Sequence, residues 1–116
     1  MPNPIVHFEI IGRDRKLLES FYGGVFDWQF MPVMEHYSMV LPGEGIHGGI
    51  GEMPQSPCNV TFYVEVADVM ATLAAAARQG GHTAYGPETL PNGQIVAGLV
   101  DPEGHLIGLM QGPPVM

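Results

Sequence analysis

Residues 7–14 of the chain read HFEIIGRD, and residues 61–68 read TFYVEVAD. Both stretches alternate side chains along a strand, both end in an aspartate, and both lead into a run with helical spacing of its apolar residues. A second match lies further along, where residues 45–50, GIHGGI, correspond to residues 104–109, GHLIGL. A short chain built from two similar units is expected to fold as two related modules that share one cavity.

The composition limits the class of protein and its partners. The chain has 116 residues, the length of one domain, and 46% of them are hydrophobic, which is enough to form a core. Its formal net charge is −8, with only four Lys and Arg residues. Because nucleic acids and anionic membrane surfaces are bound through clustered basic side chains, neither is an expected partner. No apolar run approaches the roughly 18 residues of a membrane-spanning helix.

Cys58 is the single cysteine of the sequence, so no intrachain disulfide can form. The first four residues lack the basic flank and the apolar stretch of a signal peptide. Together these observations predict a protein of the reducing cytoplasm.

The first module is expected at about residues 4–53. Asp14 is a suitable N-cap for its helix, and the pair Gly23 and Gly24 should end that helix. Its four strands are expected at residues 4–11, 28–33, 37–41 and 46–52.

The second module is expected at about residues 58–111, after a joint at residues 53–57. Asp68 should cap its alanine-rich helix at residues 69–79. Its four strands are expected at residues 59–66, 82–85, 94–100 and 106–110. The predicted fold class is α+β, a single domain over residues 1–116 in which two βαβββ modules form a cupped mixed sheet with the helices on the outside.

Side chains alternate between the two faces of a strand, so the pattern predicts which of them line the groove inside the cup. The apolar set Phe8, Ile10, Phe62, Val64 and Val66 should lie under the helices. The groove should be lined by His7, Glu9, Thr61, Tyr63 and Glu65, and on the last strand by Leu106, Gly108 and Met110. Trp28 is expected to pack against the opposite module or a partner subunit.

Five short motifs in this order resemble one known family over nearly the whole chain. They occupy residues 7–10, 21–23, 26–28, 80–81 and 101–104. The family is the vicinal oxygen chelate superfamily, also called the glyoxalase, bleomycin-resistance and dioxygenase superfamily. The resemblance implies the fold described above. It also implies a homodimer, which would help to cover exposed sheet edges.

In metal-dependent members of that superfamily each module supplies two ligands, one from its first strand and one from its last. Carried onto this sequence, the four positions hold His7, Gly49, Thr61 and Gly108. Glycine has no side-chain donor, and a Thr hydroxyl is a poor ligand for a borderline divalent metal. The resemblance thus implies the fold without a catalytic metal or other cofactor. Gly49 and Gly108 should instead leave room in the groove.

We therefore expect a protein that binds a small apolar or aromatic molecule in the groove between the modules. It would be a sequestering protein or an enzyme that works without a metal. The expected ligand-binding residues are His7, Glu9, His47, Thr61, Tyr63, Leu106 and Met110.

Other interpretations of the same residues stay open. His7, Glu9 and Tyr63 suit acid–base chemistry, but they equally suit a satisfied polar cluster. A metal-dependent lyase, isomerase or dioxygenase would hold its ion with His7, His47 and a carboxylate, and Glu52 becomes a ligand candidate if the register of the last strand is shifted. A third class is a structural or assembly protein whose groove is filled by its own side chains.

Overall fold

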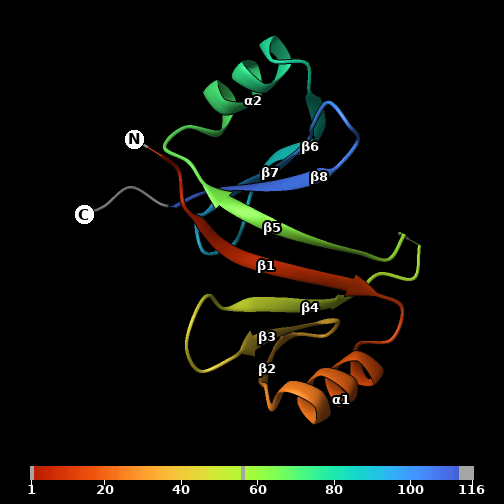
Figure 1. The fold of residues 1–116 in the computed structure, drawn as a ribbon. Coiled ribbons are helices and arrows are strands. Elements are labelled where there is room, and N and C mark those ends of the chain that lie inside the picture. Colours follow the sequence, from red (N-terminus) through yellow and green to blue (C-terminus); the bar gives the residue numbers. More distant parts are fainter. Residues whose placement is uncertain (1, 56, 113–116) are drawn as a thin grey trace. The chain divides into compact units, whose positions relative to one another are not determined.

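The computed structural model describes residues 2–55 and 57–112, so Ser56 in the predicted joint lies outside the described residues. The chain divides into two compact units, here called the N-terminal unit (Val6–Thr61) and the C-terminal unit (Phe62–Met116 with Met1–Ile5). Across the described residues, two helices and eight strands follow the order βαβββ twice (Figure 1). The predicted α+β class and the repeated order are confirmed. Neither described helix has the length and apolar character needed to cross a bilayer.

The N-terminal unit contains a four-stranded mixed sheet in the order β2-β3-β4-β1. β1 pairs in parallel with β4, and β3 pairs antiparallel with both β4 and β2. Helix α1 contacts β4 and β2 (Figure 1). The bounds are β1 Ile5–Gly12, α1 Arg15–Phe26, β2 Gln29–Met34, β3 Tyr37–Leu41 and β4 Gly48–Glu52.

Helix α1 begins where the sequence predicts and ends later. The Asp14 side chain accepts a hydrogen bond from the Leu17 N–H at 3.0 Å, which is the expected N-cap contact. The predicted end at Gly23 and Gly24 is wrong, because the helix continues to Phe26. Asp27 then takes a left-handed conformation, with φ 62°, and donates its N–H to the Gly23 carbonyl.

The aromatic residues after the predicted stop explain the longer helix. The ring of Trp28 stacks on Tyr22, with ring centres 5.5 Å apart, and also contacts Phe8 and Phe26. Trp28 therefore packs inside its own unit, and its further contact with the opposite module or a partner subunit stays a prediction. The rings of Phe8, Tyr22 and Trp28 pack against the buried core of Ile10, Val40 and Ile50.

The C-terminal unit repeats the arrangement with the strand order β5-β8-β7-β6. β5 pairs in parallel with β8, and β7 pairs antiparallel with both β8 and β6. The bounds are β5 Asn59–Glu65, α2 Val69–Arg78, β6 His82–Thr89, β7 Ile95–Val100 and β8 Leu106–Gln111. The first three residues of β5 belong to the N-terminal unit. Strand β6 is longer than predicted and has two register shifts.

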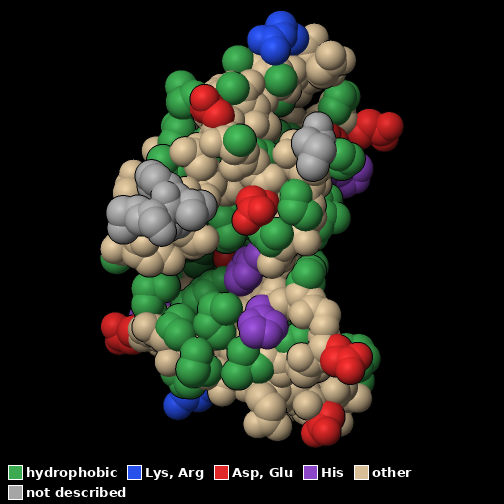
Figure 2. Space-filling model, turned by 90° about the vertical axis from the view of Figure 1, so that its left-hand side faces the viewer, with side chains coloured by type: hydrophobic (Ala, Val, Ile, Leu, Met, Phe, Trp, Pro, Cys, Tyr) green, Lys and Arg blue, Asp and Glu red, His purple; other side chains and the backbone are tan. Residues whose placement is uncertain are grey.

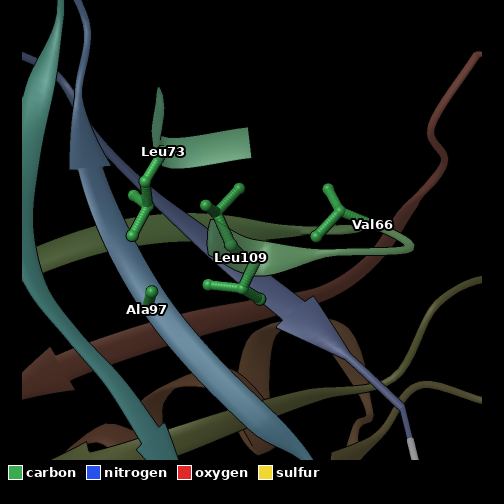
Figure 3. Packing of buried hydrophobic residues seen from close by; sticks show 5 residues of the cluster. Val66, Leu73, Ala97 and Leu109 are labelled. Atoms are coloured by element: carbon green, nitrogen blue, oxygen red, sulfur yellow. The ribbon is translucent and has the colours of Figure 1, made fainter. Parts of the chain in front are cut away.

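The core of the C-terminal unit lies between α2 and its sheet. Figure 3 shows Leu73 of α2 above Ala97 of β7 and Leu109 of β8, with Val66 beside them. Val64 packs against the same cluster, as the alternation of β5 predicts. Asp68 caps α2 by accepting from the Ala71 N–H at 3.1 Å, so both helices start with the same contact.

Candidate functional site

Each sheet has one face toward its helix and one face away from it, here called the distal face. On the distal face of the N-terminal unit one row crosses all four strands, because the register pairs Met31 with Met39, Met39 with Gly49, and Gly49 with Glu9. Directly opposed residues have their side chains on the same face, about 5 Å apart. His7 lies two residues before Glu9 and shares this face, as predicted.

Tyr37 connects the two predicted polar residues of this face. Its hydroxyl donates to a Glu9 carboxylate oxygen at 3.0 Å, and the same hydroxyl lies 3.2 Å from His7 Nε2. A tyrosine hydroxyl has one proton. Because that proton is directed at Glu9, the contact with His7 requires His7 to carry its proton on Nε2 and to donate. The result is a hydrogen-bonded chain from imidazole through phenol to carboxylate.

Burial and nearby charge keep the His7 imidazole and the Tyr37 phenol neutral. Burial lowers the pKa of His7, and the nearby His47 lowers it further. Burial together with the Glu9 carboxylate raises the pKa of Tyr37 well above its ordinary value. At pH 7 the His7 imidazole and the Tyr37 phenol are therefore both neutral.

Tyr37 also occupies the space beside Gly49. A Cβ on Gly49 would lie 1.7 Å from the Tyr37 hydroxyl oxygen, and a Cβ on Gly51 would lie 3.0 Å from the same ring. The expectation that Gly49 leaves room in the groove is therefore wrong. The missing side chain is what allows the phenol to reach both His7 and Glu9.

The C-terminal unit carries an equivalent row with different side chains. Its register pairs Tyr85 with Gly98, Gly98 with Gly108, and Gly108 with Tyr63. A Cβ on Gly98 would lie 2.3 Å from the Tyr85 ring, and one on Gly108 would lie 2.5 Å from the Tyr63 ring. The two hydroxyls are 3.2 Å apart. The space beside Gly108 is thus filled by aromatic rings, which corrects the same expectation for this unit.

The strand register gives Gly49 and Gly108 equivalent positions in the two units. Gly49 is opposite Glu9 in the N-terminal unit, and Gly108 is opposite Tyr63 in the C-terminal unit. The pairing of Gly49 with Gly108, inferred from the sequence repeat, therefore agrees with the strand pairing. A tyrosine ring lies over each of them, Tyr37 over Gly49 and Tyr63 over Gly108.

The other candidate residues differ in exposure. His47 is exposed in the segment before β4, and its carbonyl accepts a hydrogen bond from the Phe8 N–H. Thr61 is buried in the N-terminal part of β5. Leu106 and Met110 are half-buried on the distal face of β8, two residues on either side of Gly108.

Glu52 has a role within the fold. It accepts the Arg15 N–H at 2.9 Å at the start of α1, and His36 Nδ1 lies 2.8 Å from its other oxygen. The Arg15 backbone N–H and the hydrogen bond with His36 lower the pKa of the Glu52 carboxyl. The conditional prediction of Glu52 as a metal ligand therefore finds no support in this geometry.

Over residues 2–55 and 57–112, no three His, Cys, Asp or Glu side chains come together in a way that could hold a metal ion. His7 and Glu9 share the distal face, but the Tyr37 hydroxyl lies between them. A hollow of about 380 Å³ in the N-terminal unit lies elsewhere, beside Leu17, Cys58 and Val60, and none of the predicted site residues lines it. Among the described residues, the distal face of the N-terminal unit therefore offers groups that can hydrogen-bond a ligand, and no assembled set of metal ligands.

Apolar side chains lie next to the hydrogen-bonded chain of His7, Tyr37 and Glu9. Met31 is 49% exposed and Met34, which lies opposite Tyr37, is 66% exposed on β2, and Met39 is half-buried between Met31 and Gly49. Figure 2 shows histidine and hydrophobic side chains at the surface on the same side of the molecule. Methionine is unbranched and polarisable, so it adapts to flat ligands.

Sequence reasoning missed Tyr37, Tyr85, Met31 and Met39 as site residues. Tyr37 and Met39 alternate along β3 with Ser38 and Val40, which are buried. That alternation could have placed both on the distal face. Nothing in the sequence gives the register that brings the Tyr37 hydroxyl to His7.

Solved structures share this fold. A methylmalonyl-CoA epimerase in complex with methylmalonyl-CoA and NH4+ matches with a TM-score of 0.70 and 19% identity, covering 98% of this chain and 100% of that chain. A hypothetical protein from Bacillus halodurans C-125 matches with a TM-score of 0.74 and 15% identity, over 100% and 99%. A Streptomyces coelicolor methylmalonyl-CoA epimerase in complex with 2-nitronate-propionyl-CoA gives 0.69 and 19%, over 95% and 97%.

Sequence comparison is consistent with this fold. A glyoxylase-like domain-containing protein of Didymella fabae is 29% identical over 85 residues. The match covers 63% of this chain and 65% of that protein, so the chain spans less than two thirds of this relative's length. No family model matches the chain.

Proposed function

We propose that this is a glyoxalase-like protein that binds a small, uncharged apolar or aromatic molecule without a catalytic metal. The ligand lies against the distal face of the N-terminal unit. Met31 and Met39 contact its apolar surface, and the chain of His7, Tyr37 and Glu9 orients a polar group. The observation that carries the proposal is the Tyr37 hydroxyl, held between His7 and Glu9 and beside exposed apolar side chains.

The charge of the site supports an uncharged ligand. Anionic groups such as phosphates are bound by Lys, Arg or helix N-termini. The four basic residues are Arg13, Arg15, Lys16 and Arg78, and all lie in or beside the two helices. Because the distal face of the N-terminal unit instead carries the Glu9 carboxylate, CoA thioesters such as those bound by the structural relatives are not the ligands that we propose.

The alternative is a metal-dependent protein that would hold its ion with His7, His47 and a carboxylate. In its favour, His47 lies near enough to His7 to lower its pKa; against it, no three such side chains of the described residues come together around an ion site. Metal analysis of protein purified without chelator separates the two proposals. Stoichiometric Zn, Ni, Mn or Fe that is lost in His7→Ala would establish the alternative, whereas a metal content below one tenth per chain supports metal-free binding.

A thermal-shift panel of neutral aromatic compounds, such as indole, 2-naphthol and benzamide, tests the binding itself. A ligand that binds only the folded state raises the melting temperature by mass action. We expect Tyr37→Phe to weaken the best compound about tenfold, equivalent to roughly 1.4 kcal/mol for one hydrogen-bonding group. Tyr22→Phe, on α1 and away from the distal face, is the matched control and should bind normally. Equal loss in both variants, or no shift with any compound, would contradict the proposal.

A further inference from the structure

The polar protons in the chain of His7, Tyr37 and Glu9 all point the same way. The Tyr37 hydroxyl donates its one proton to a Glu9 carboxylate oxygen at 3.0 Å. The same hydroxyl oxygen therefore accepts the N–H of His7 Nε2, which lies 3.2 Å away. Because burial and His47 lower the pKa of His7, its imidazole is neutral at pH 7 and has a single N–H. Both polar protons are thus used within the chain.

What the chain offers to a ligand is the capacity to accept hydrogen bonds. The Tyr37 oxygen has two lone pairs, and the His7 N–H uses one of them, so the other can accept from a second molecule. A carboxylate such as that of Glu9 accepts at both of its oxygens. All three side chains are half-buried, so the chain stays partly accessible from the surface.

The charge near the chain favours the same kind of ligand. Burial and the negative charge of Glu9 raise the pKa of Tyr37, so the carboxylate acts directly on the phenol. The four Lys and Arg residues lie in or beside the helices, and Arg15 directs its Nη1 to Glu19 and Ser38. Ser38 alternates with Tyr37 along β3, so this arginine contacts the opposite face of the sheet. The partly positive hydrogen of an N–H or O–H group is therefore stabilised on the distal face, and the lone pair of an ether or a furan is not.

The C-terminal unit shows that the fold does not impose this direction. Tyr63 takes the place there that Glu9 takes in the N-terminal unit, opposite the equivalent glycine. The Tyr63 hydroxyl lies 3.2 Å from that of Tyr85, and either oxygen can be the donor. The fixed direction in the N-terminal unit therefore comes from its carboxylate and its imidazole.

We propose that the distal face of the N-terminal unit selects a ligand with a hydrogen-bond donor, an aromatic N–H or O–H such as that of an indole or a phenol. The donor points to the Tyr37 oxygen and to Glu9, and the flat ring lies against Met31 and Met39. This selectivity rests on the function proposed above and adds the chemistry of the ligand's polar group. Flat molecules of the same size whose polar atom only accepts bind more weakly, because that atom's lone pair faces the lone pairs of the chain.

Indole and 1-benzofuran form a matched pair that tests the donor requirement. Both are flat fused rings of nearly the same size, and the N–H of one is an oxygen in the other. Isothermal titration calorimetry should give indole a dissociation constant about tenfold lower, the effect expected of one hydrogen-bonding group. Apolar burial alone would give the opposite order, because 1-benzofuran leaves water more readily. The pair of 2-naphthol and 2-methoxynaphthalene should show the same preference for the donor.

The two pairs also separate this selectivity from binding itself. Equal dissociation constants within both pairs, with shifts of the Met31 and Met39 methyl resonances on binding, would overturn the donor requirement and leave the proposed function standing. Binding of none of the four compounds would overturn both.

Glu9→Gln tests the group that sets the direction. The amide can still accept from Tyr37 through its oxygen, but it adds N–H donors at nearly the same size. The preference for indole over 1-benzofuran should fall from about tenfold to below about threefold. Glu103→Gln, in the exposed turn after β7, removes the same charge and should keep the wild-type preference. A wild-type preference in Glu9→Gln would overturn the role given to Glu9, and the compound pairs test the donor requirement on the wild type even if this variant does not fold.

Discussion

The phenol of Tyr37 lies directly over Gly49, so that a Cβ at position 49 would be 1.7 Å from the phenol oxygen. Any side chain on Gly49 must displace this ring from His7 and Glu9. Gly49 therefore matters because its lack of a side chain leaves the space that the Tyr37 ring occupies.

Gly49→Ala should expel the Tyr37 hydroxyl and break its contacts with His7 and Glu9. Overpacking of this kind costs about 1–3 kcal/mol in the free energy of unfolding, which urea titration measures. Gly112→Ala is the matched control, because a Cβ there meets no atom within 4 Å, and it should change stability by less than ~0.5 kcal/mol. An unchanged midpoint in Gly49→Ala would show that Tyr37 does not occupy this place.

The lowered pKa of His7 predicts a loss of stability on mild acidification. Because burial and His47 keep the folded-state pKa below the ordinary 6.5, the unfolded chain takes up the proton first as the pH falls. This contribution is complete above about pH 6.5 and is lost as the pH falls from there through the folded-state value. Urea unfolding at several pH values between 7.5 and 5 should show the decline.

His7→Gln removes the titrating group, so the decline over this window should become shallower. The exposed His82→Gln variant is its control and should retain the decline. The lowered pKa values of Glu52 and Asp101 act in a lower window, since their contributions are lost only as the pH falls below about 4.5 and 3.8. A His7→Gln variant with the wild-type pH dependence would exclude His7 as the responsible group.

Ser38 should stabilise the N-terminal unit through a buried polar cluster. Its hydroxyl is fully buried, accepts from Arg15 Nη1 at 2.7 Å and donates to a Glu19 carboxylate oxygen at 2.6 Å. Ser38→Ala leaves both charged partners short of one hydrogen bond, which costs about 1–3 kcal/mol. Chemical denaturation measures the loss, and a cost below ~0.5 kcal/mol would mean that the ion pair does not need the hydroxyl.

Leu109 should be among the most costly residues to truncate in the C-terminal unit. It is 2% exposed and packs with Leu73, Val66 and Ala97. Leu109→Ala should lower the free energy of unfolding by about 2–5 kcal/mol, since it removes buried methyl groups and leaves a cavity. Met70→Ala on the exposed side of α2 is the control and should cost less than ~0.5 kcal/mol.

The alternation in β1 and β5 predicted much of the fold, because period-2 patterns depend only on neighbouring residues. Ile10, Val64 and Val66 lie on the helix side, as expected. The end of α1 was predicted wrongly because Gly23 and Gly24 look like a stop locally. The tertiary contacts of Phe26 and Trp28 extend the helix past them.

The candidate site was predictable only in part. The sequence shows that Gly49 and Gly108 lack side chains, but it does not show which residue fills the space. That depends on how Tyr37 and Tyr63 reach across the strands, which follows from register and rotamer. His7 and Glu9 were predicted from parity, whereas Tyr37, which joins them, required the pairing of β3 with β4.

The most direct test of metal-free binding on the distal face follows the methionine methyl resonances of chelator-treated protein during titration with 2-naphthol. We predict saturable shifts of the Met31 and Met39 methyls, with Met53 and Met70 unchanged, and the same dissociation constant after addition of Zn or Mn. Shifts that appear only once a divalent metal is added, or that leave Met31 and Met39 unmoved while 2-naphthol binds, would contradict it.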